Sequence, residues 1–198
     1  WPQDRITAAI TAEARKGRRV VRLKSGDPSI FGRAGEELAA AKAAGIPCDI
    51  VPGVTAACAA SAQLGRSLTE RGVADVLVLA TGTGCPDEPL PDCTRLSGPG
   101  TTTAFYMSVR QAARVSDKLI ERGLPPDARV DICVDVSKSS EEYLQTTVTN
   151  LSEDIKRHGV MGCAVLLVTW PTAAVSADKF SHTEVKNIGN GSGRAFVG

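Results

Sequence analysis

Residues 20–37 read Val-Val-Arg-Leu-Lys-Ser-Gly-Asp-Pro-Ser-Ile-Phe-Gly-Arg-Ala-Gly-Glu-Glu, and this stretch decides the expected fold of the first part of the chain. The apolar run that ends at Lys24 predicts a strand over residues 19–24, and the Ser-Gly-Asp-Pro segment predicts a tight turn before a helix. In an open α/β sheet, ligands bind at the carboxyl ends of the strands. Gly26 permits close approach of a ligand to the backbone, and Asp27 adds a carboxylate. The stretch therefore predicts a binding loop.

The alternation of helices and strands continues to residue 80. The order predicts a parallel sheet with helices on its faces, in a partial first α/β domain over residues 1–82. Because the chain opens on a helix with no strand before it, we expect it to be a piece of a longer protein. Helical patterns cover residues 1–17, 31–44 and 55–64, where Thr55 is a candidate N-cap, and strand patterns cover 48–51 and 76–80.

A change of composition follows in residues 83–100, which are rich in glycine and proline and predict a linker. A second α/β domain is expected over residues 101–175, with a tail over 176–198. One strand of this domain is expected to be antiparallel, so its sheet is mixed. The expected strands cover 101–107, 130–136, 143–148 and 163–170, and the expected helices cover 108–122 and 151–158.

Composition and charge exclude several function classes. The chain has 198 residues, of which 42% are hydrophobic and 23% charged, as in a globular protein with a core. Its net charge of +1 gives no electrostatic footprint for nucleic acid or for an anionic membrane. No apolar run approaches the ~18 residues of a membrane span. We expect a cytoplasmic protein.

The six cysteines are scattered and form no Cys-x-x-Cys pair. Cys48, Cys133 and Cys163 fall in apolar runs and are expected to be small buried residues in a reducing compartment. Cys85 and Cys93 flank a proline-rich loop, and a disulfide between them in an oxidising setting stays open.

The histidines do not predict a metal site. His158 and His182 are the only two in the chain, they are far apart in sequence, and each is expected at the surface. No metal cofactor is therefore expected.

With these residues in place, the chain resembles the tetrapyrrole (uroporphyrinogen/precorrin) methyltransferase family. The stretch Val20–Pro28, with Ile-Phe-Gly-Arg at 30–33 and Gly-Glu-Glu at 35–37, is similar to the specific signature of that family. Weaker similarities are Val-Pro-Gly-Val-Thr-Ala at 51–56, Leu-Thr-Glu-Arg at 68–71 and Ala-Phe-Tyr-Met at 104–107. The resemblance extends from residue 1 to about 171.

The resemblance implies two α/β domains with S-adenosylmethionine in the cleft between them, in a homodimer. It implies transfer of methyl groups to C2 and C7 of uroporphyrinogen III, giving precorrin-2 for cobalamin or sirohaem and S-adenosylhomocysteine as the spent cofactor. Three residues match positions for substrate binding and proton handling: Arg33, Glu36 and Arg71. Eight residues match or neighbour cofactor positions: Gly26, Asp27, Ile30, Thr55, Ala56, Met107, Val136 and Ala164.

Departures from the family pattern keep two alternatives open. Ser25 stands where the family has Gly, Arg66 and Ser67 replace Ile-Pro, Glu70 replaces His, and Thr83 replaces His. The opening Gly-Pro-Gly-Asp loop of the family is absent. The chain could instead be another precorrin methyltransferase, or a non-catalytic member that binds cofactor or tetrapyrrole. A nucleotide-phosphate site at Gly26 and Asp27 is less favoured, because there is no phosphate-binding glycine loop.

Each candidate residue also has an ordinary structural interpretation. Asp27 could begin a helix turn, Met107 could pack in a core, and Thr55 could be only a cap. Arg33 and Glu36 are spaced as an i,i+3 surface ion pair, which contributes ~0.3–0.5 kcal/mol. Arg71 could be a solvated loop charge.

Overall fold

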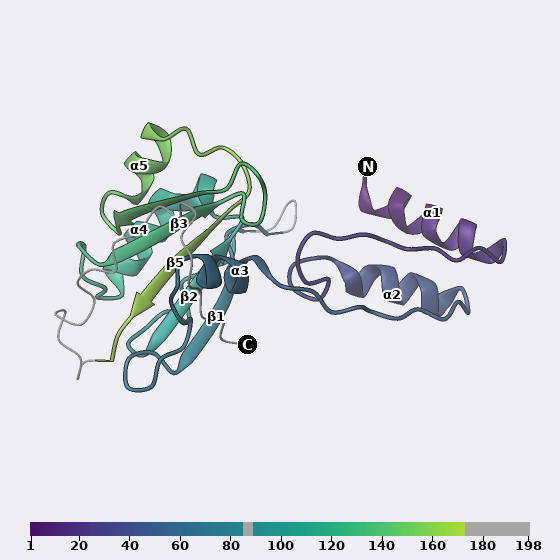
Figure 1. Ribbon diagram of the computed structural model, residues 1–198, viewed down its shortest axis with the longest axis horizontal. Coiled ribbons are helices and arrows are strands. Elements are labelled where there is room, and N and C mark those ends of the chain that lie inside the picture. Colours follow the sequence, from purple (N-terminus) through teal and green to yellow (C-terminus); the bar gives the residue numbers. More distant parts are fainter. Residues whose placement is uncertain (85–88, 173–198) are drawn as a thin grey trace, which may run out of the picture.

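The computed structural model describes residues 1–84 and 89–172. Three helices come first, and every strand in these residues follows them, from residue 76 onward (Figure 1). In order they are α1 (Gln3–Arg15), α2 (Ala34–Ala43), α3 (Ala56–Gln63), β1 (Val76–Thr81), β2 (Thr101–Tyr106), the 3-10 turn η1 (Val109–Gln111), α4 (Ala112–Glu121), β3 (Arg129–Val134), β4 (Glu142–Thr147), α5 (Leu151–Arg157) and β5 (Ala164–Trp170).

The five strands form one mixed sheet in the order β1-β2-β5-β3-β4. β1 pairs parallel to β2, whereas β5 runs antiparallel to both β2 and β3. Tyr106 at the end of β2 is therefore opposite Val165, and Val134 at the end of β3 is opposite Ala164. One edge of the sheet thus gathers the carboxyl ends of β1, β2 and β3 and the amino end of β5.

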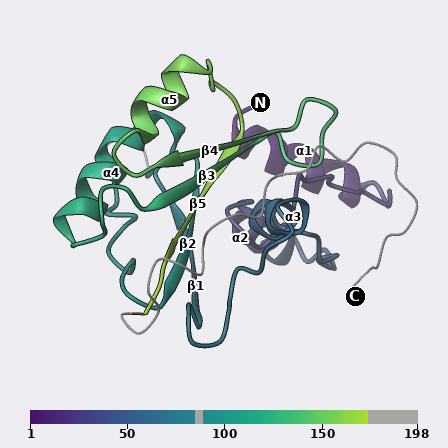
Figure 2. The ribbon, with the colours of Figure 1, turned by 60° about the vertical axis from the view of Figure 1, so that its left-hand side comes forward.

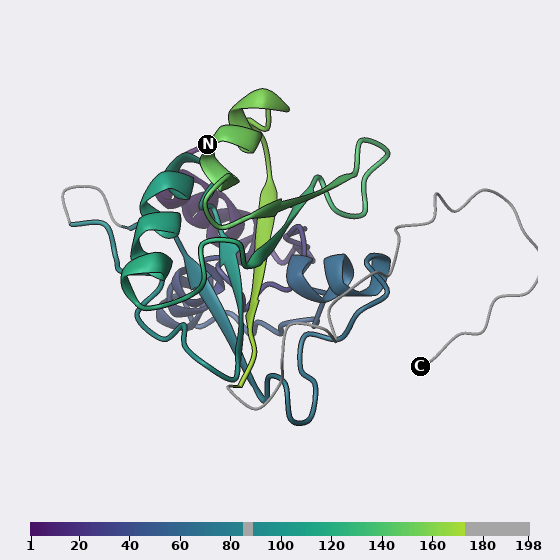
Figure 3. The same ribbon diagram turned by 90° about the vertical axis from the view of Figure 1, so that its left-hand side faces the viewer.

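Helices cover both faces of the sheet. Figure 3 shows α4, in teal, and α3, in blue, on opposite sides of it. The apolar stripe of α4, which includes Val115 and Leu119, packs with α5 against buried residues such as Ile132 and Leu166. On the other face, the small residues of α3 pack closely on a second cluster that includes Leu167.

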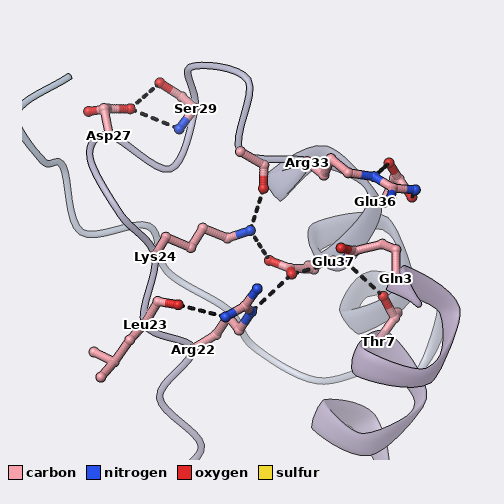
Figure 4. A network of polar contacts seen from close by, with 11 residues as sticks. Gln3, Thr7, Arg22, Leu23, Lys24, Asp27, Ser29, Arg33, Glu36 and Glu37 are labelled. Atoms are coloured by element: carbon pink, nitrogen blue, oxygen red, sulfur yellow. Dashed lines mark hydrogen bonds and ion pairs between the residues drawn. The ribbon is translucent and has the colours of Figure 1, made fainter. Parts of the chain in front are cut away.

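A separate layer is formed by α1 and α2, which pack on each other and stand apart from the sheet (Figures 1 and 2). Glu37 of α2 links α1 and the segment around Lys24 to α2. Its carboxylate accepts a hydrogen bond from Gln3 of α1 at 2.9 Å and pairs with Lys24 at 2.8 Å, and the Lys24 ammonium also donates to the Gly32 carbonyl (Figure 4). Both charged side chains of this pair are largely buried.

The strands expected over residues 19–24 and 48–51 are wrong, and with them the parallel sheet of the first domain. These segments are extended, but within the described residues neither has a hydrogen-bonded neighbour strand. A β-strand needs a neighbouring strand to hydrogen-bond its backbone groups, and an apolar pattern in the sequence does not show whether such a neighbour is present. Consequently Val21, Leu23 and Val51 are exposed.

The burial expected for two cysteines is also wrong. Cys133, on β3, is buried, but Cys48 and Cys163 are exposed, because Cys48 lies in an unpaired segment and Cys163 precedes β5. Cys93 is a free thiol, whereas Cys85 lies outside the described residues, and so does His182. His158 lies at the surface, as expected.

The other elements follow the expectation closely. The three early helices and the whole series from residue 101 to 170 form within a few residues of their expected bounds, and β4 is antiparallel. The strand expected over 76–80 forms as β1, but it pairs with β2. The segment 83–100 therefore connects two neighbouring strands of one sheet, while the tail over 176–198 lies outside the described residues.

No helix in the described residues is both long enough and apolar enough to cross a membrane.

A buried charge cluster lies under the loop that follows α3. Asp131 on β3 is 2% exposed and accepts from Arg129 Nε at 2.8 Å, and its other oxygen lies 2.9 Å from Arg66 Nη1. Burial lowers the pKa of the Arg66 guanidinium, and the charge of Asp131 opposes that shift. Arg66, one of the departures from the family pattern, therefore serves to anchor its loop to the sheet.

We expect Asp131→Asn to lower the free energy of unfolding by about 3–5 kcal/mol, because it leaves buried guanidinium charge without its counter-ion. Urea denaturation followed by circular dichroism measures the change. Asp117→Asn, at an exposed position on α4, is the control and should be nearly neutral. Equal stability of the two variants would contradict this account of the cluster.

Candidate functional site

The candidate site is at the sheet edge where β1, β2 and β3 end and β5 begins. The amino end of α3 and the loop over residues 25–33 meet this edge, and the segment over 52–55 lies between them. Three of the stretches singled out in the sequence are thus brought together, although they are far apart in the chain.

Asp27 ties two of these loops together. Its Oδ1 accepts from the Ser29 backbone N–H at 2.8 Å, as well as from the Ser29 hydroxyl (Figure 4). Its Oδ2 accepts from the Gly53 N–H at 3.0 Å. These hydrogen bonds, that of the Ser29 hydroxyl first, lower the pKa of the Asp27 carboxyl below its usual range. The carboxylate is therefore an ionised cross-link between the loops.

Two glycines let the loop backbones touch. A Cβ on Gly53 would lie 2.5 Å from the Gly26 carbonyl oxygen, closer than any side chain tolerates. Gly26 has φ +77°, which disfavours side-chain-bearing residues. The turn at Gly26 therefore presents backbone groups directly at the site, as a ligand-binding loop requires.

Thr55 precedes α3, but its side chain makes no capping hydrogen bond. Its hydroxyl oxygen lies 2.7 Å from the phenol oxygen of Tyr106, which also accepts from the Ala57 N–H at 3.0 Å. The Tyr106 ring is tilted against that of Phe31, with centroids 5.0 Å apart. Tyr106 thus bridges the end of β2 to both loops.

Backbone strain is concentrated at the same edge. Among the described residues, all five non-glycine residues with positive φ lie in the loop over 25–33 or directly after β2 and β3. Such conformations cost of the order of 1–3 kcal/mol each and cluster at binding sites. They are Phe31, Arg33, Met107, Asp135 and Ser137.

Exposed apolar side chains border the polar backbone. Phe31 is 40% exposed, Val54 is 67% exposed and Met107 is 48% exposed. The Met107 sulfur accepts a hydrogen bond from the Thr83 hydroxyl at 3.5 Å, which holds that side chain beside the end of β1. The edge therefore offers apolar contact together with backbone donors and acceptors, as small-molecule sites commonly do.

Other sequence-predicted cofactor residues lie around the same edge. Ile30 follows the Asp27 turn, to which its N–H donates at 3.2 Å, and Ala56 is the first residue of α3. Val136 follows β3 and packs against the cluster under α3, while Ala164 begins β5. Their roles toward a ligand stay predictions.

Arg33 and Glu36 form the i,i+3 ion pair that their spacing permits. The guanidinium donates to both carboxylate oxygens, at 2.7 and 2.8 Å, and both side chains are exposed (Figure 4). The hydrogen bond from Arg33 lowers the pKa of Glu36. The pair lies where the loop over 25–33 meets the first turn of α2. An anionic ligand group at that position could bind the Arg33 guanidinium.

Arg71 is not brought to this cluster. It lies in the turn between Glu70 and Ala74, whose backbone pairs with Thr172 just after β5. This turn precedes β1, and Figure 2 shows the chain descending to it from α3. Six residues of strand separate it from the edge with Tyr106, roughly 17 Å. Its proposed role in substrate binding stays a prediction.

Sequence reasoning missed the residues that hold the site together. Tyr106, Gly53, Ser29 and Phe31 all lie within quoted motifs, but none was singled out. Two local signals could have indicated these residues. Tyr106 is an aromatic residue at the end of an expected strand, and Ser29 follows Asp27 by two residues, which is the spacing of an Asx turn. Contacts across 26 and 51 residues of sequence gave no local signal.

No three His, Cys, Asp or Glu side chains in residues 1–84 and 89–172 gather so that they could hold a metal ion.

Comparison with known proteins identifies the family of this chain. The family profile of tetrapyrrole (corrin/porphyrin) methylases matches residues 2–152. The chain therefore belongs to the tetrapyrrole methylase family.

Among curated proteins, the chain is similar to siroheme synthases. A siroheme synthase of Escherichia coli (strain K12 / DH10B) is 43% identical over 152 residues, which cover 77% of this chain and 33% of that protein. The chain thus spans about a third of the length of the curated relatives that it matches.

Solved structures give the same fold. The crystal structure of uroporphyrin-III-C-methyltransferase from Thermus thermophilus is 38% identical with a TM-score of 0.71, covering 85% of this chain and 71% of that one. A second Thermus thermophilus structure, complexed with S-adenosylhomocysteine, is 28% identical with a TM-score of 0.72, covering 84% and 73%. A cobalt precorrin-4 methyltransferase is 26% identical with a TM-score of 0.77, covering 86% and 72%.

We expect Asp27→Ala to loosen the cross-link between the two loops without unfolding the chain. The Gly53 amide loses its acceptor, so its hydrogen exchange should become several-fold faster. Amide exchange followed by NMR measures this, with Asp49→Ala at an exposed position as the control. Unchanged exchange at Gly53 would contradict the role assigned to Asp27.

Proposed function

We propose that the chain is an S-adenosylmethionine-dependent C-methyltransferase that methylates uroporphyrinogen III at C2 and C7, giving precorrin-2. The observation that carries the proposal is the convergence of the loop over 25–33, the segment over 52–55 and Met107 at one strained edge. Identities of 43% to a siroheme synthase and 38% to a uroporphyrin-III-C-methyltransferase support this substrate class.

The residues at the edge fit the cofactor. The close contact of Gly26 with Gly53 holds the peptide groups of the two loops beside each other, where a ligand could bind to both. The Thr55 hydroxyl and the backbone of Asp27 would hold the polar parts of S-adenosylmethionine, and Phe31 and Met107 would cover its apolar parts. The neighbour complexed with S-adenosylhomocysteine supports this assignment.

Bound S-adenosylmethionine supplies an electrophilic methyl group on a sulfonium. The contribution of this chain is positioning, because methyl transfer needs the acceptor carbon aligned with the reacting bond, and good alignment is worth about 7–11 kcal/mol. Arg33 would bind a substrate carboxylate bidentately, and Glu36 would then be free of its partner. A Glu36 carboxylate released in this way could accept the proton that the pyrrole carbon loses.

The first test is calorimetric titration of the chain with S-adenosylhomocysteine, followed by product analysis with S-adenosylmethionine and uroporphyrinogen III. We expect saturable binding, and a product that carries two added methyl groups. Asp27→Ala should weaken binding. Methylation of precorrin-3 or precorrin-4 instead would favour another precorrin methyltransferase, and binding without turnover would favour a non-catalytic member.

Arg71 gives a separate prediction. Because it lies far from the cross-linked loops, Arg71→Ala should change the affinity for S-adenosylhomocysteine by less than about two-fold, while it raises the KM for uroporphyrinogen III. Steady-state kinetics with each substrate varied in turn measure the two effects, with Arg15→Ala on α1 as the control. Equal losses for both substrates would argue against a substrate role.

The homodimer and the cytoplasmic location stay predictions, and sedimentation of the purified chain tests the first.

A further inference from the structure

Tyr106 is the side chain that contacts both loops of the candidate site from the sheet. Its phenol oxygen lies 2.7 Å from Thr55 Oγ1 and accepts from the Ala57 N–H at 3.0 Å. Its ring packs on Phe31 in the loop over 25–33. It thus joins β2 to both segments.

The backbone around Tyr106 is held from two sides. Its carbonyl accepts from the Gly82 N–H at 2.9 Å, just after β1, and from the Ser108 hydroxyl at 2.9 Å. Gly82 packs so closely on Ser108 that a Cβ there would lie 2.6 Å from the Ser108 hydroxyl oxygen. The phenol group therefore projects from a fixed point of the sheet, which makes it suited to orient its neighbours.

The hydrogen-bond role of the phenol oxygen is fixed toward Ala57 and is open toward Thr55. The Ala57 N–H can only donate, so the phenol oxygen is its acceptor. In the contact between the phenol oxygen and Thr55 Oγ1, either hydroxyl can donate. When the phenol donates, Thr55 Oγ1 accepts from Tyr106, and the hydroxyl hydrogen of Thr55 is left to point to a ligand.

We propose that Tyr106 is a positioning residue for S-adenosylmethionine, acting by holding the Thr55 hydroxyl as a hydrogen-bond donor to the cofactor. This inference rests on the proposed function. It assigns Tyr106 no contact with the cofactor and no part in the methyl transfer itself. Its effect on the cofactor therefore passes entirely through Thr55.

The test uses Tyr106→Phe, which keeps the ring against Phe31 and removes only the hydroxyl. We expect the Kd for S-adenosylhomocysteine, measured by calorimetry, to rise about ten-fold, as for loss of one well-placed hydrogen bond. The KM for S-adenosylmethionine should rise in parallel, with a smaller change in kcat. Tyr143→Phe is the matched control, because Tyr143 is the other tyrosine and its hydroxyl bonds to Glu141 on the far side of β3.

A double-mutant cycle separates positioning from mere stabilisation of the fold. Thr55→Val should itself raise the Kd, and Tyr106→Phe should then add little in the Thr55→Val background, because its effect acts through Thr55. Thr55→Ser, which keeps the hydroxyl, should bind nearly as wild type. A purely structural role would give additive losses in the cycle.

The outcomes distinguish this inference from the function on which it rests. Wild-type chain that binds S-adenosylhomocysteine while Tyr106→Phe binds equally well overturns the inference and leaves the proposed function standing. Additive losses in the cycle also overturn it. Wild-type chain that does not bind overturns both. If Tyr106→Phe fails to fold, Thr55→Val against Thr55→Ser decides whether the donor hydroxyl matters.

Discussion

The pairing of β5 antiparallel to both β2 and β3 is the constraint on which the site depends. It brings the beginning of one strand beside the ends of two others, so the segments around Val136, Ala164 and Met107 share an edge. In an all-parallel sheet, the beginning of β5 would lie at the opposite edge. The central position of β5 also buries its apolar residues under helices on both faces, so this register is strongly favoured by burial.

The loops at that edge are held by polar contacts rather than by a core. Asp27, Tyr106 and the glycine contact each join segments that are distant in sequence, and the positive-φ residues lie among them. Strained backbone persists only where surrounding contacts over-determine it. The cross-links thus explain how this edge keeps its shape although much of its surface, including Val54, is exposed.

Local patterns were sufficient for most of the elements and insufficient for the pairing. The helix α2 (Ala34–Ala43) and the series after residue 101 were predictable, because periodicity and flanking glycines are local signals. The segment over 19–24 has the composition of a strand but no neighbour, and composition cannot reveal that. Likewise the motifs located Gly26, Asp27 and Thr55, whereas the part played by Tyr106 depends on contacts with residues about fifty positions earlier in the chain.

The layer of α1 and α2 stands apart from the sheet, and the loops over 25–33 and 52–55 lie where the two parts of the molecule meet (Figure 1). In mechanical terms, the described contacts at this junction are a few hydrogen bonds and one ring contact. A molecule bound there would contact both parts, so its binding would reduce whatever conformational entropy the two parts have relative to each other. A ligand at the proposed cofactor site would therefore also act as a brace between the two parts of the molecule.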